Sequence, residues 1–364
     1  MTNSSLTRQP RVRLVLDGVP VDGCRSAEII SRRGAQAASF RILASASSVA
    51  KTLGRSWVDK DKLDVAIDFG FLPTGISAAV MPWVRMITGN VDRISFDQPR
   101  GLVSLDGRDH AARLIDLPIQ DSYLNRTSSE LAALLASSCE LSGDIDTTHG
   151  LIGQYYQIQH TKSALSGFSK HGNGWDLLSE LADLEGFDLW VDGTTLHFKQ
   201  ADTTNTKIYD LTSEQPTTNR ASPVFTISDL SMERTLGLAG SMQVTVSSWN
   251  SRQRQKIIAS YPPDTSTATS KQFLILRPNL LPDEAEVLAK NTYNRLRAHQ
   301  YVVNGTMAGE LVLTTQHRLR LAGTGTGWDR IYTIDRIERE MSLEGGYIQH
   351  IVGRSEPSGV ADDG

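Results

Sequence analysis

Three groups of residues in this chain could take part in chemistry, and the first is a set of histidines. His149, His160 and His171 stand eleven residues apart in loop-like sequence, and histidine is a common zinc ligand. This interval is too long for one helical face, and the sequence has neither an HExxH motif nor a paired CxxC motif. We therefore expect no metal site unless folding gathers the three side chains.

Aspartates and a glycine-rich run form the other two groups. Asp106, Asp109 and Asp116 could serve as general acids or bases, but they follow an expected strand, where aspartate more often shapes a turn. Residues 323–327 alternate glycine and threonine like a phosphate-binding loop, yet no lysine follows and no helix begins there. We expect a hairpin tip instead. The sequence thus predicts no catalytic residue and no cofactor, and so a protein that is not an enzyme.

The overall composition lacks a nucleic-acid or membrane signature. The 364 residues leave room for two or three domains, and the formal net charge of −4 gives no basic footprint for duplex DNA. No apolar run approaches the ~20 residues of a membrane span, and residues 1–10 lack the apolar core of an export signal. Cys24 and Cys139 form no disulfide framework, so we expect small packing residues in a protein made in a reducing cytoplasm.

The most informative pattern is a short phrase that occurs twice. Each copy reads as a strand, a polar turn and a second strand that ends on Gly-Arg. The first copy contains Val91, Asp92, Arg93, Ile94, Gly107 and Arg108, and the second contains Ile334, Asp335, Arg336, Ile337, Gly353 and Arg354. Self-similarity of this kind predicts one structural unit used twice. Coincidence is the alternative, because hairpins draw on few residue types.

The elements that would position these residues are mainly strands. Alternation of apolar and polar residues predicts strands near 12–16, 38–44 and 63–69. Two more are expected at 83–87 and 91–96, around a turn at Gly89 and Asn90, and one at 102–105. Closely spaced strands without a long helix favour a sandwich or barrel over the first ~110 residues.

The middle of the chain changes to helical spacing. Thr127 and Glu130 form a capping box ahead of a leucine-rich helix. A second helix is expected from Asn173 to Gly186, and a hairpin over 187–198. These elements predict a small α+β domain.

The last part returns to strands. Residues 202–222 read as a linker, and strands are expected at 224–227, 242–246, 310–315 and 318–321. A third helix is expected at 282–299, with Pro282 in its first turn and acidic residues near its positive end. Residues 261–271 read as an exposed excursion, and 356–364 as a polar, acidic tail that is disordered or orders only against a partner.

Five stretches together resemble a known family: residues 16–21, 87–92, 105–116, 175–198 and 328–334. The chain resembles, over about residues 11–355, the late-control-D-like tail hub proteins of tailed phages, which are related to the hub half of type VI secretion spike proteins. The resemblance implies a β-rich α+β fold. It implies two tube-type β-barrel domains, at 1–114 and 223–355, with an inserted α+β domain of two helices and a hairpin at 115–201. No catalytic residue comes with this family.

The resemblance also implies a function in assembly. Two similar barrels per chain would let a homotrimer present six, which would match a six-fold tail tube to a three-fold central spike protein. The partners implied are the tail tube or distal tail protein, the spike, baseplate or tape-measure proteins, and DNA that passes without specific binding. The expected location is the virion tail tip or baseplate, after assembly in the host bacterial cytoplasm, without membrane insertion. The exposed segments 202–222, 261–271 and 282–299 are candidate interfaces.

Two other functions stay open on the sequence. A glycan-binding or glycan-processing tail accessory protein would show a cleft with two carboxylates about 5–10 Å apart. A monomeric β-rich binding module would be a compact, solitary chain.

Overall fold

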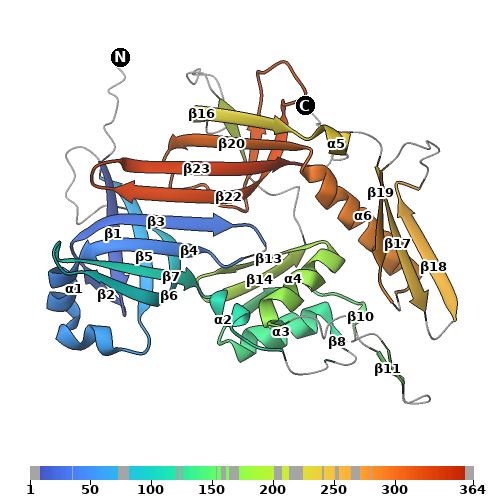
Figure 1. Cartoon of the computed structure of the whole chain (residues 1–364), viewed down its shortest axis with the longest axis horizontal. Helices are drawn as coiled ribbons and strands as arrows, with labels where there is room; N and C mark the ends of the chain where they lie inside the picture. The colour runs from blue at the N-terminus through green and yellow to red at the C-terminus, as the bar shows by residue number, and fades with distance from the viewer. Residues whose placement is uncertain are drawn as a thin grey trace.

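A computed structural model of the chain contains two β units, an α+β insert and a small sheet covered by a helix (Figure 1). Each packs around an apolar core of its own. The structure describes residues 9–34, 36–72, 82–119, 123, 126–152, 154–156, 161–163, 172–200, 207–212, 224–239, 242–250, 254–263, 271–278 and 280–356.

The first β unit is a curled sheet in the strand order β2-β1-β5-β6-β7-β4-β3. Its strands are β1 (Gln9–Leu16), β2 (Val19–Val21), β3 (Cys24–Arg32), β4 (Ser39–Ser45), β5 (Asp64–Leu72), β6 (Val84–Asp97) and β7 (Leu102–Asp109). The helices α1 (Ala46–Leu53) and η1 (Arg55–Asp59) lie between β4 and β5. Alternate residues such as Leu14, Ile42 and Ile67 are fully buried, as the two-residue period of a strand with one wet face requires. Among these described strands, β2 and β3 do not pair with each other.

The second β unit closes on itself. It contains β15 (Ile208–Thr212), β16 (Val224–Arg234), β20 (Tyr301–Ala308), β21 (Arg318–Leu321), β22 (Arg330–Ser342) and β23 (Gly346–Ser355). Successive pairs run from β22 through β21, β15, β16, β20 and β23, and β23 pairs with β22 again. The interior holds a core that includes Leu319, Tyr332 and Ile334.

The insert follows β7 and has the expected helices. It contains α2 (Ala112–Ile115), β8 (Arg126–Thr127), α3 (Ser128–Ser138), β9 (Ser142–Ile145), β10 (Leu151–Ile152), β11 (Gln154–Tyr156), β12 (Thr161–Ser163), α4 (Gly174–Glu185), β13 (Phe187–Asp192) and β14 (Thr195–Gln200). The predicted capping box of α3 is confirmed, since the Thr127 hydroxyl accepts from the Glu130 amide at 3.2 Å and the Glu130 carboxylate accepts from the Thr127 amide at 3.1 Å. The left-handed Gly186 ends α4, as predicted.

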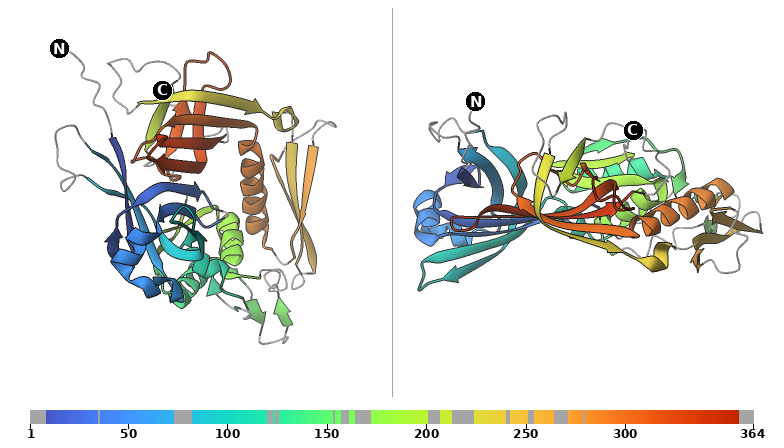
Figure 2. Two further views of the ribbon diagram at one scale, coloured as in Figure 1. Left: turned by 60° about the vertical axis from the view of Figure 1, so that its left-hand side comes forward. Right: turned by 90° about the horizontal axis from the view of Figure 1, so that it is seen from above.

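A separate small layer interrupts the second β unit. The strands β17 (Met242–Asn250), β18 (Gln255–Tyr261) and β19 (Lys271–Leu276) form a sheet, and α5 (Leu236–Ala239) precedes it. The two views of Figure 2 show α6 (Pro282–Ala298) lying against this sheet, with which it shares a core. The range 223–355, expected to be one barrel with a helix, therefore contains two cores.

Eight antiparallel strands join the two β units into one continuous layer. Figure 1 shows this layer from top to bottom as β16-β20-β23-β22-β3-β4-β7-β6. The joint is the pairing of β22 with β3, which runs from Arg336 opposite Arg32 to Ser342 opposite Ser26. Arg339 is buried at the joint, where its guanidinium donates to the Ser31 hydroxyl at 3.1 Å and the Leu313 carbonyl at 2.6 Å.

Three sequence expectations differ from the structure. The stretch read as a linker at 202–222 contains β15, a strand between β21 and β16. The strands expected at 83–87 and 91–96 are one strand, β6, because Gly89 lies within it, opposite Asp109, rather than in a turn. Residues 310–315 form no strand but a loop, in which Leu313 is buried.

Several expectations fall on residues outside those described. They concern His160, His171, the rest of the 202–222 segment, residues 264–270 of the excursion and the 357–364 tail. Within the described residues, no helix has both the length and the apolar character to cross a bilayer.

Candidate functional site

The first copy of the duplicated phrase forms a β-bulge between β6 and β7. Val91 lies opposite Gly107 and Arg93 lies opposite Asp106, so Asp92 is the extra residue of the bulge. The Asp92 carboxylate accepts two hydrogen bonds from Arg108, at 2.7 Å and 3.1 Å. A bulge of this kind re-aims a side chain and ends regular pairing, and here it points a carboxylate at the arginine that follows the opposing glycine.

The second copy forms the same arrangement between β22 and β23. Ile334 lies opposite Gly353 and Arg336 lies opposite Val352, which leaves Asp335 as the bulged residue. Asp335 forms an ion pair with Arg354, again the arginine after the opposing glycine. The two phrases therefore have one register, one bulge position and one ion pair in common.

The two glycines of the phrase let a neighbouring strand approach closely. A Cβ atom on Gly107 would lie 2.1 Å from the Asn90 carbonyl oxygen and 2.4 Å from the Phe40 ring. A Cβ atom on Gly353 would lie 3.2 Å from the Val303 side chain. Phe40 lies opposite Gly107 and Val303 opposite Gly353 in their sheets, so the equivalence extends to the strands β4 and β20.

A second pair of bulges extends the match by one more strand. In β3 the register with β4 shifts between Cys24 and Ser26, and in β16 the register with β20 shifts between Ile227 and Asp229. Ile29 then lies opposite Phe40, and Met232 lies opposite Val303. We call β3-β4-β7-β6 the first half of the layer and β16-β20-β23-β22 the second half; each half carries both bulges at corresponding positions.

The ion pairs of the two copies differ in environment. Arg108 also donates to Asp116, at 3.0 Å, and its hydrogen bonds to the carboxylates of Asp92 and Asp116 raise the pKa of its guanidinium. Burial raises the pKa of Asp335, although the charge of Arg354 opposes the change. The first ion pair, Arg108 with Asp92, is the more exposed, and Arg108 has a second carboxylate beside it in Asp116. In the second ion pair both Asp335 and Arg354 are half-buried.

The arginine after each bulge also has an acidic neighbour. Arg93 contacts Asp106 at 3.2 Å, and Arg41 from β4 contacts the same carboxylate at 2.7 Å. Burial alone would raise the pKa of Asp106, but the two arginines lower it. In the second copy, Arg336 contacts Glu338 at 2.5 Å on its own strand.

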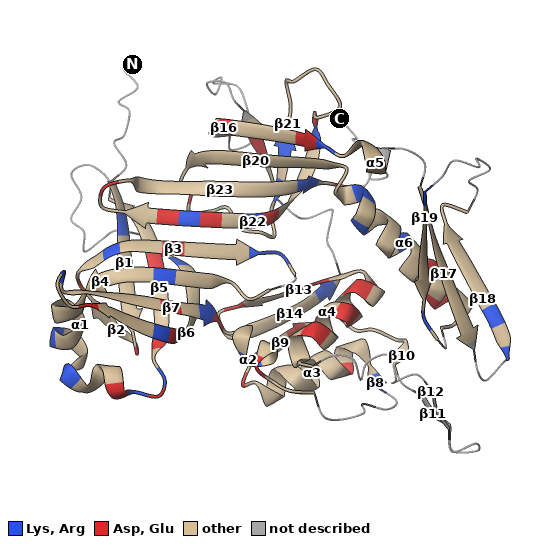
Figure 3. Cartoon of the chain, in the orientation of Figure 1, with Lys and Arg blue, Asp and Glu red and all other residues tan. Residues whose placement is uncertain are grey.

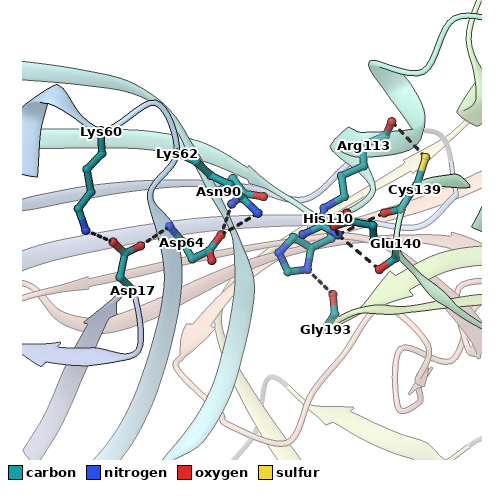
Figure 4. A network of polar contacts seen from close by, with 10 residues as sticks. All are labelled: Asp17, Lys60, Lys62, Asp64, Asn90, His110, Arg113, Cys139, Glu140 and Gly193. Carbon is teal, nitrogen blue, oxygen red and sulfur yellow. Dashed lines mark hydrogen bonds and ion pairs between the residues drawn. The ribbon is translucent and has the colours of Figure 1, made fainter. Parts of the chain in front are cut away.

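A polar network at the end of the first half ties the first β unit to the insert (Figure 4). The His110 ring lies 2.8 Å from the Gly193 carbonyl, and Arg113 donates to the Cys139 carbonyl at 3.2 Å. Burial lowers the pKa of His110 and raises the pKa of Cys139. Neither change prepares a nucleophile, since it is the thiolate that reacts, which agrees with the packing role expected for this cysteine.

The residues considered for catalysis are held in structural contacts. The Asp109 carboxyl accepts from the amides of Ala38 and Ala111, both at 3.0 Å, and burial raises its pKa to about 7. The 323–327 run connects the antiparallel strands β21 and β22, which confirms the predicted hairpin tip, and Asp329 accepts from its Gly325 amide at 2.9 Å. In the described part of the chain, no three His, Cys, Asp or Glu side chains gather in a way that could hold a metal ion.

Sequence reasoning missed the joint between the two units. No strand was predicted over residues 24–32, so β3 and its pairing with β22 were both missed. Nor do the sequences of β3, CRSAEIISR, and β16, VFTISDLSMER, show that their bulges correspond. The repeated phrase was the one signal available.

Comparison with known proteins shows where this fold occurs. No protein-family model matches the sequence, and the comparison with curated proteins found no match. A tail protein from Neisseria meningitidis MC58 aligns over 95% of this chain and 97% of its own, with a TM-score of 0.65 and 14% identity. The 43 kDa tail protein of prophage MuSo2 from Shewanella oneidensis aligns over 95% and 96%, with a TM-score of 0.61 and 16% identity.

A third structure extends the likeness to secretion systems. The E. coli c3393 protein, a component of the type VI secretion system described as similar to the T4 tail proteins gp27 and gp5, aligns over 95% of this chain and 77% of its own. Its TM-score is 0.51 and its identity 10%. At these identities the likeness establishes the fold, and it confirms the resemblance seen in the sequence. The chain has the fold of phage tail proteins.

Proposed function

We propose that this chain is a structural hub at the distal end of a phage tail, and that it acts as a trimeric ring. Three chains would match a six-fold tail tube to a three-fold central spike and line the channel for DNA. The observation that carries this proposal is the eight-stranded layer built from two matching halves. Three copies of a chain that contains one motif twice can present six similar surfaces.

The barrel interpretation belongs to the same proposal. The closed cycle of six strands would be one tube-type barrel, and the curled first β unit, open between β2 and β3, would be the other. The two bulged hairpins would then be copies of one ancestral unit. Superposition of the two halves on their bulged aspartates tests this duplication, since copies should overlay strand for strand.

The fold and the resemblance to tail hub proteins support the following partners. They are a second and third copy of the chain, a tail tube or distal tail protein, a spike, and neighbouring baseplate or tape-measure proteins. Figure 3 shows lysines and arginines interspersed with aspartates and glutamates along the described strands and helices. Mixed charge of this kind would suit a channel through which DNA slides, because basic walls retain phosphates. The chain would then be a virion component that performs no catalysis.

Mass photometry of the purified chain, alone and with a co-encoded candidate spike protein, tests the hub. The expected result is a particle of three times 39.9 kDa that binds one spike trimer. A chain that stays monomeric and ignores the spike refutes the hub. An unrelated globular protein mixed with the same spike is the control for non-specific association.

A further inference from the structure

A cavity of about 250 Å³ lies where the first β unit, the insert and the second β unit meet. The first β unit contributes the end of β3 and the start of β6 to its lining. The insert contributes the β13–β14 hairpin and the start of α4, and the second β unit contributes the 314–316 loop and β22. Beside the cavity, the Arg33 guanidinium links all three parts, because it donates to the Asp188 carboxylate at 3.1 Å and to the Thr315 carbonyl at 3.2 Å.

The guanidinium of Arg339 brings a buried positive charge to this cavity. Arg339 is 4% exposed, and it donates to the Ser31 hydroxyl and the Leu313 carbonyl, which are both neutral groups. In the described part of the chain no carboxylate forms an ion pair with it, whereas Arg354 on the paired strand has Asp335. Burial accordingly lowers the pKa of Arg339. A buried charge is costly unless it is paired, so an anion beside Arg339 would stabilise the fold.

Two buried donors on residues that line the cavity have no hydrogen-bond acceptor among the described residues. They are the Nε of Arg339 and the indole Nε1 of Trp175, a residue that is 3% exposed. Arg339 belongs to β22 and Trp175 to the first turn of α4, so the two donors come from different units of the chain. A buried donor without an acceptor is destabilising. Because both N–H groups can only donate, the ligand that suits them is one whose atoms accept hydrogen bonds.

The other charged residues of the lining also favour an anion. Arg32 and Arg85 line the cavity together with two aspartates, Asp109 and Asp192. Arg85 pairs with Asp68, and Asp192 is exposed. Burial raises the pKa of Asp109 to about 7, so below this pH its carboxyl carries a proton instead of a charge. Below pH 7 the lining therefore carries more positive than negative charge.

We propose that this cavity binds a small oxyanion of the phosphate class, held by the guanidinium of Arg339 and the indole N–H of Trp175. Such an ion combines a negative charge with several acceptor oxygens, which neither water nor a halide ion does. Its size also fits. A water molecule occupies about 30 Å³ of the liquid, so the cavity has room for an ion of several heavy atoms, and it is smaller than the roughly 300–1,000 Å³ of sites for drug-sized ligands. The ion would hold three units of one chain together, a function separate from the proposed hub.

The indole N–H signals of the full chain test the site directly. The chain has six tryptophans, so labelling them with nitrogen-15 gives one indole signal each, and Trp175→Phe and Trp249→Phe identify two of these signals. Sodium phosphate is titrated at pH 6 into protein in a buffer free of phosphate and sulfate, and sodium chloride of equal ionic strength is the control. The Trp175 signal should move and saturate at millimolar phosphate or below, because its N–H gains an acceptor. The signal of Trp249, which is 54% exposed on the small sheet, should not move.

Arg339→Met tests the role of the buried charge. Methionine keeps an unbranched side chain, and apolar replacement of a buried charge is often tolerated. The variant should bind phosphate at least about ten-fold more weakly, which is the effect of one hydrogen bond to a charged group. Phosphate should also raise the melting temperature of the wild type, because a ligand that binds only the folded state stabilises it, and it should raise that of the variant less. The matched control is Arg336→Met, three residues earlier on β22 and paired with Glu338, which should keep the wild-type affinity.

Each outcome supports the site or overturns it. A Trp175 signal that saturates with phosphate in the wild type, and needs higher phosphate concentrations in Arg339→Met, supports it. A Trp175 signal that phosphate leaves in place, or that chloride moves equally, overturns it. An Arg339→Met chain that binds phosphate as tightly as the wild type also overturns it. If circular dichroism shows that Arg339→Met does not fold, the wild-type titration with its chloride control decides by itself. Mass photometry reports on the hub separately, so a monomeric chain that binds phosphate refutes the hub and supports the site.

Discussion

Replacing Gly107 by alanine should destabilise the first β unit far more than the same change at Gly353. In the first copy the new Cβ would lie 2.1 Å from the Asn90 carbonyl oxygen and 2.4 Å from Phe40. Normal carbon contacts are about 3.5–4.0 Å, so the overlap exceeds 1 Å. The carbonyl belongs to β6, which is held by β5 and β7, and cannot move without disturbing the bulge. We expect a loss of about 3 kcal/mol in the free energy of unfolding, the upper end of overpacking penalties.

The second copy provides the matched control. At Gly353 the nearest contact of the new Cβ would be the Val303 side chain at 3.2 Å, which can shift by a few tenths of an ångström. Alanine also lowers the entropy of the unfolded chain, which offsets about 0.4–1 kcal/mol. We therefore expect a change within about 1 kcal/mol of the wild type at this position.

Urea unfolding and amide exchange measure both effects. The chain has several cores, so a single transition is not assured, and hydrogen exchange assigns the loss to β6 and β7 or to β22 and β23. Faster exchange confined to the mutated hairpin supports the reasoning. A Gly107→Ala protein as stable as the wild type, or a Gly353→Ala protein that is the weaker of the two, refutes it.

Two further predictions concern titration and ion pairs. Burial raises the pKa of Asp109 to about 7, so the folded chain keeps a proton on this carboxyl that the unfolded chain loses near pH 4. The contribution of Asp109 to stability should therefore be fully present below pH 4 and be lost as the pH rises to 7, by at most about 4 kcal/mol. Asp109→Asn should flatten this part of a urea-midpoint profile against pH, and an unchanged slope contradicts the assignment. Asp335→Ala removes the carboxylate that pairs with the half-buried Arg354, so it should lower the free energy of unfolding by about 2 kcal/mol. Asp92→Ala should change this free energy by less than about 1 kcal/mol, because Arg108 keeps its ion pair with Asp116. Equal losses in urea unfolding would count against the difference in burial.

The sequence predicts local elements well where a side chain acts on its own backbone. The capping box at Thr127, the glycine stop at Gly186 and the proline start of α6 all depend on groups within a few residues. Each was predicted with its type and its approximate bounds. The hairpin β13–β14 was predicted for the same reason, since its turn residues lie between its strands.

What the sequence missed depends on contacts far along the chain. β15 was predicted to be linker because the sequence around this five-residue strand is rich in Thr and Ser. Its strand conformation depends on pairing with β21 and β16, which lie far along the chain. β6 was divided in two because a glycine usually ends a strand, whereas Gly89 gives room to the Arg108 carbonyl. The repeated phrase predicted that one motif occurs twice, but it did not predict a bulge in either copy. Only the register of the opposing strands shows this.

Similar substitutions at corresponding positions of the two halves should differ in their effect, because Ile29 lies at the joint with β22 whereas Met232 lies where β16 has no pairing with β15. Ile29 is fully buried at the internal joint, so Ile29→Ser should lower the free energy of unfolding by about 3 kcal/mol or more. Met232, its counterpart, is exposed in the single chain, so Met232→Ser should change that free energy by less than about 0.5 kcal/mol. Urea unfolding of the two variants measures the difference. A Met232→Ser chain that unfolds as easily as the Ile29→Ser chain would contradict the difference in burial between the two positions.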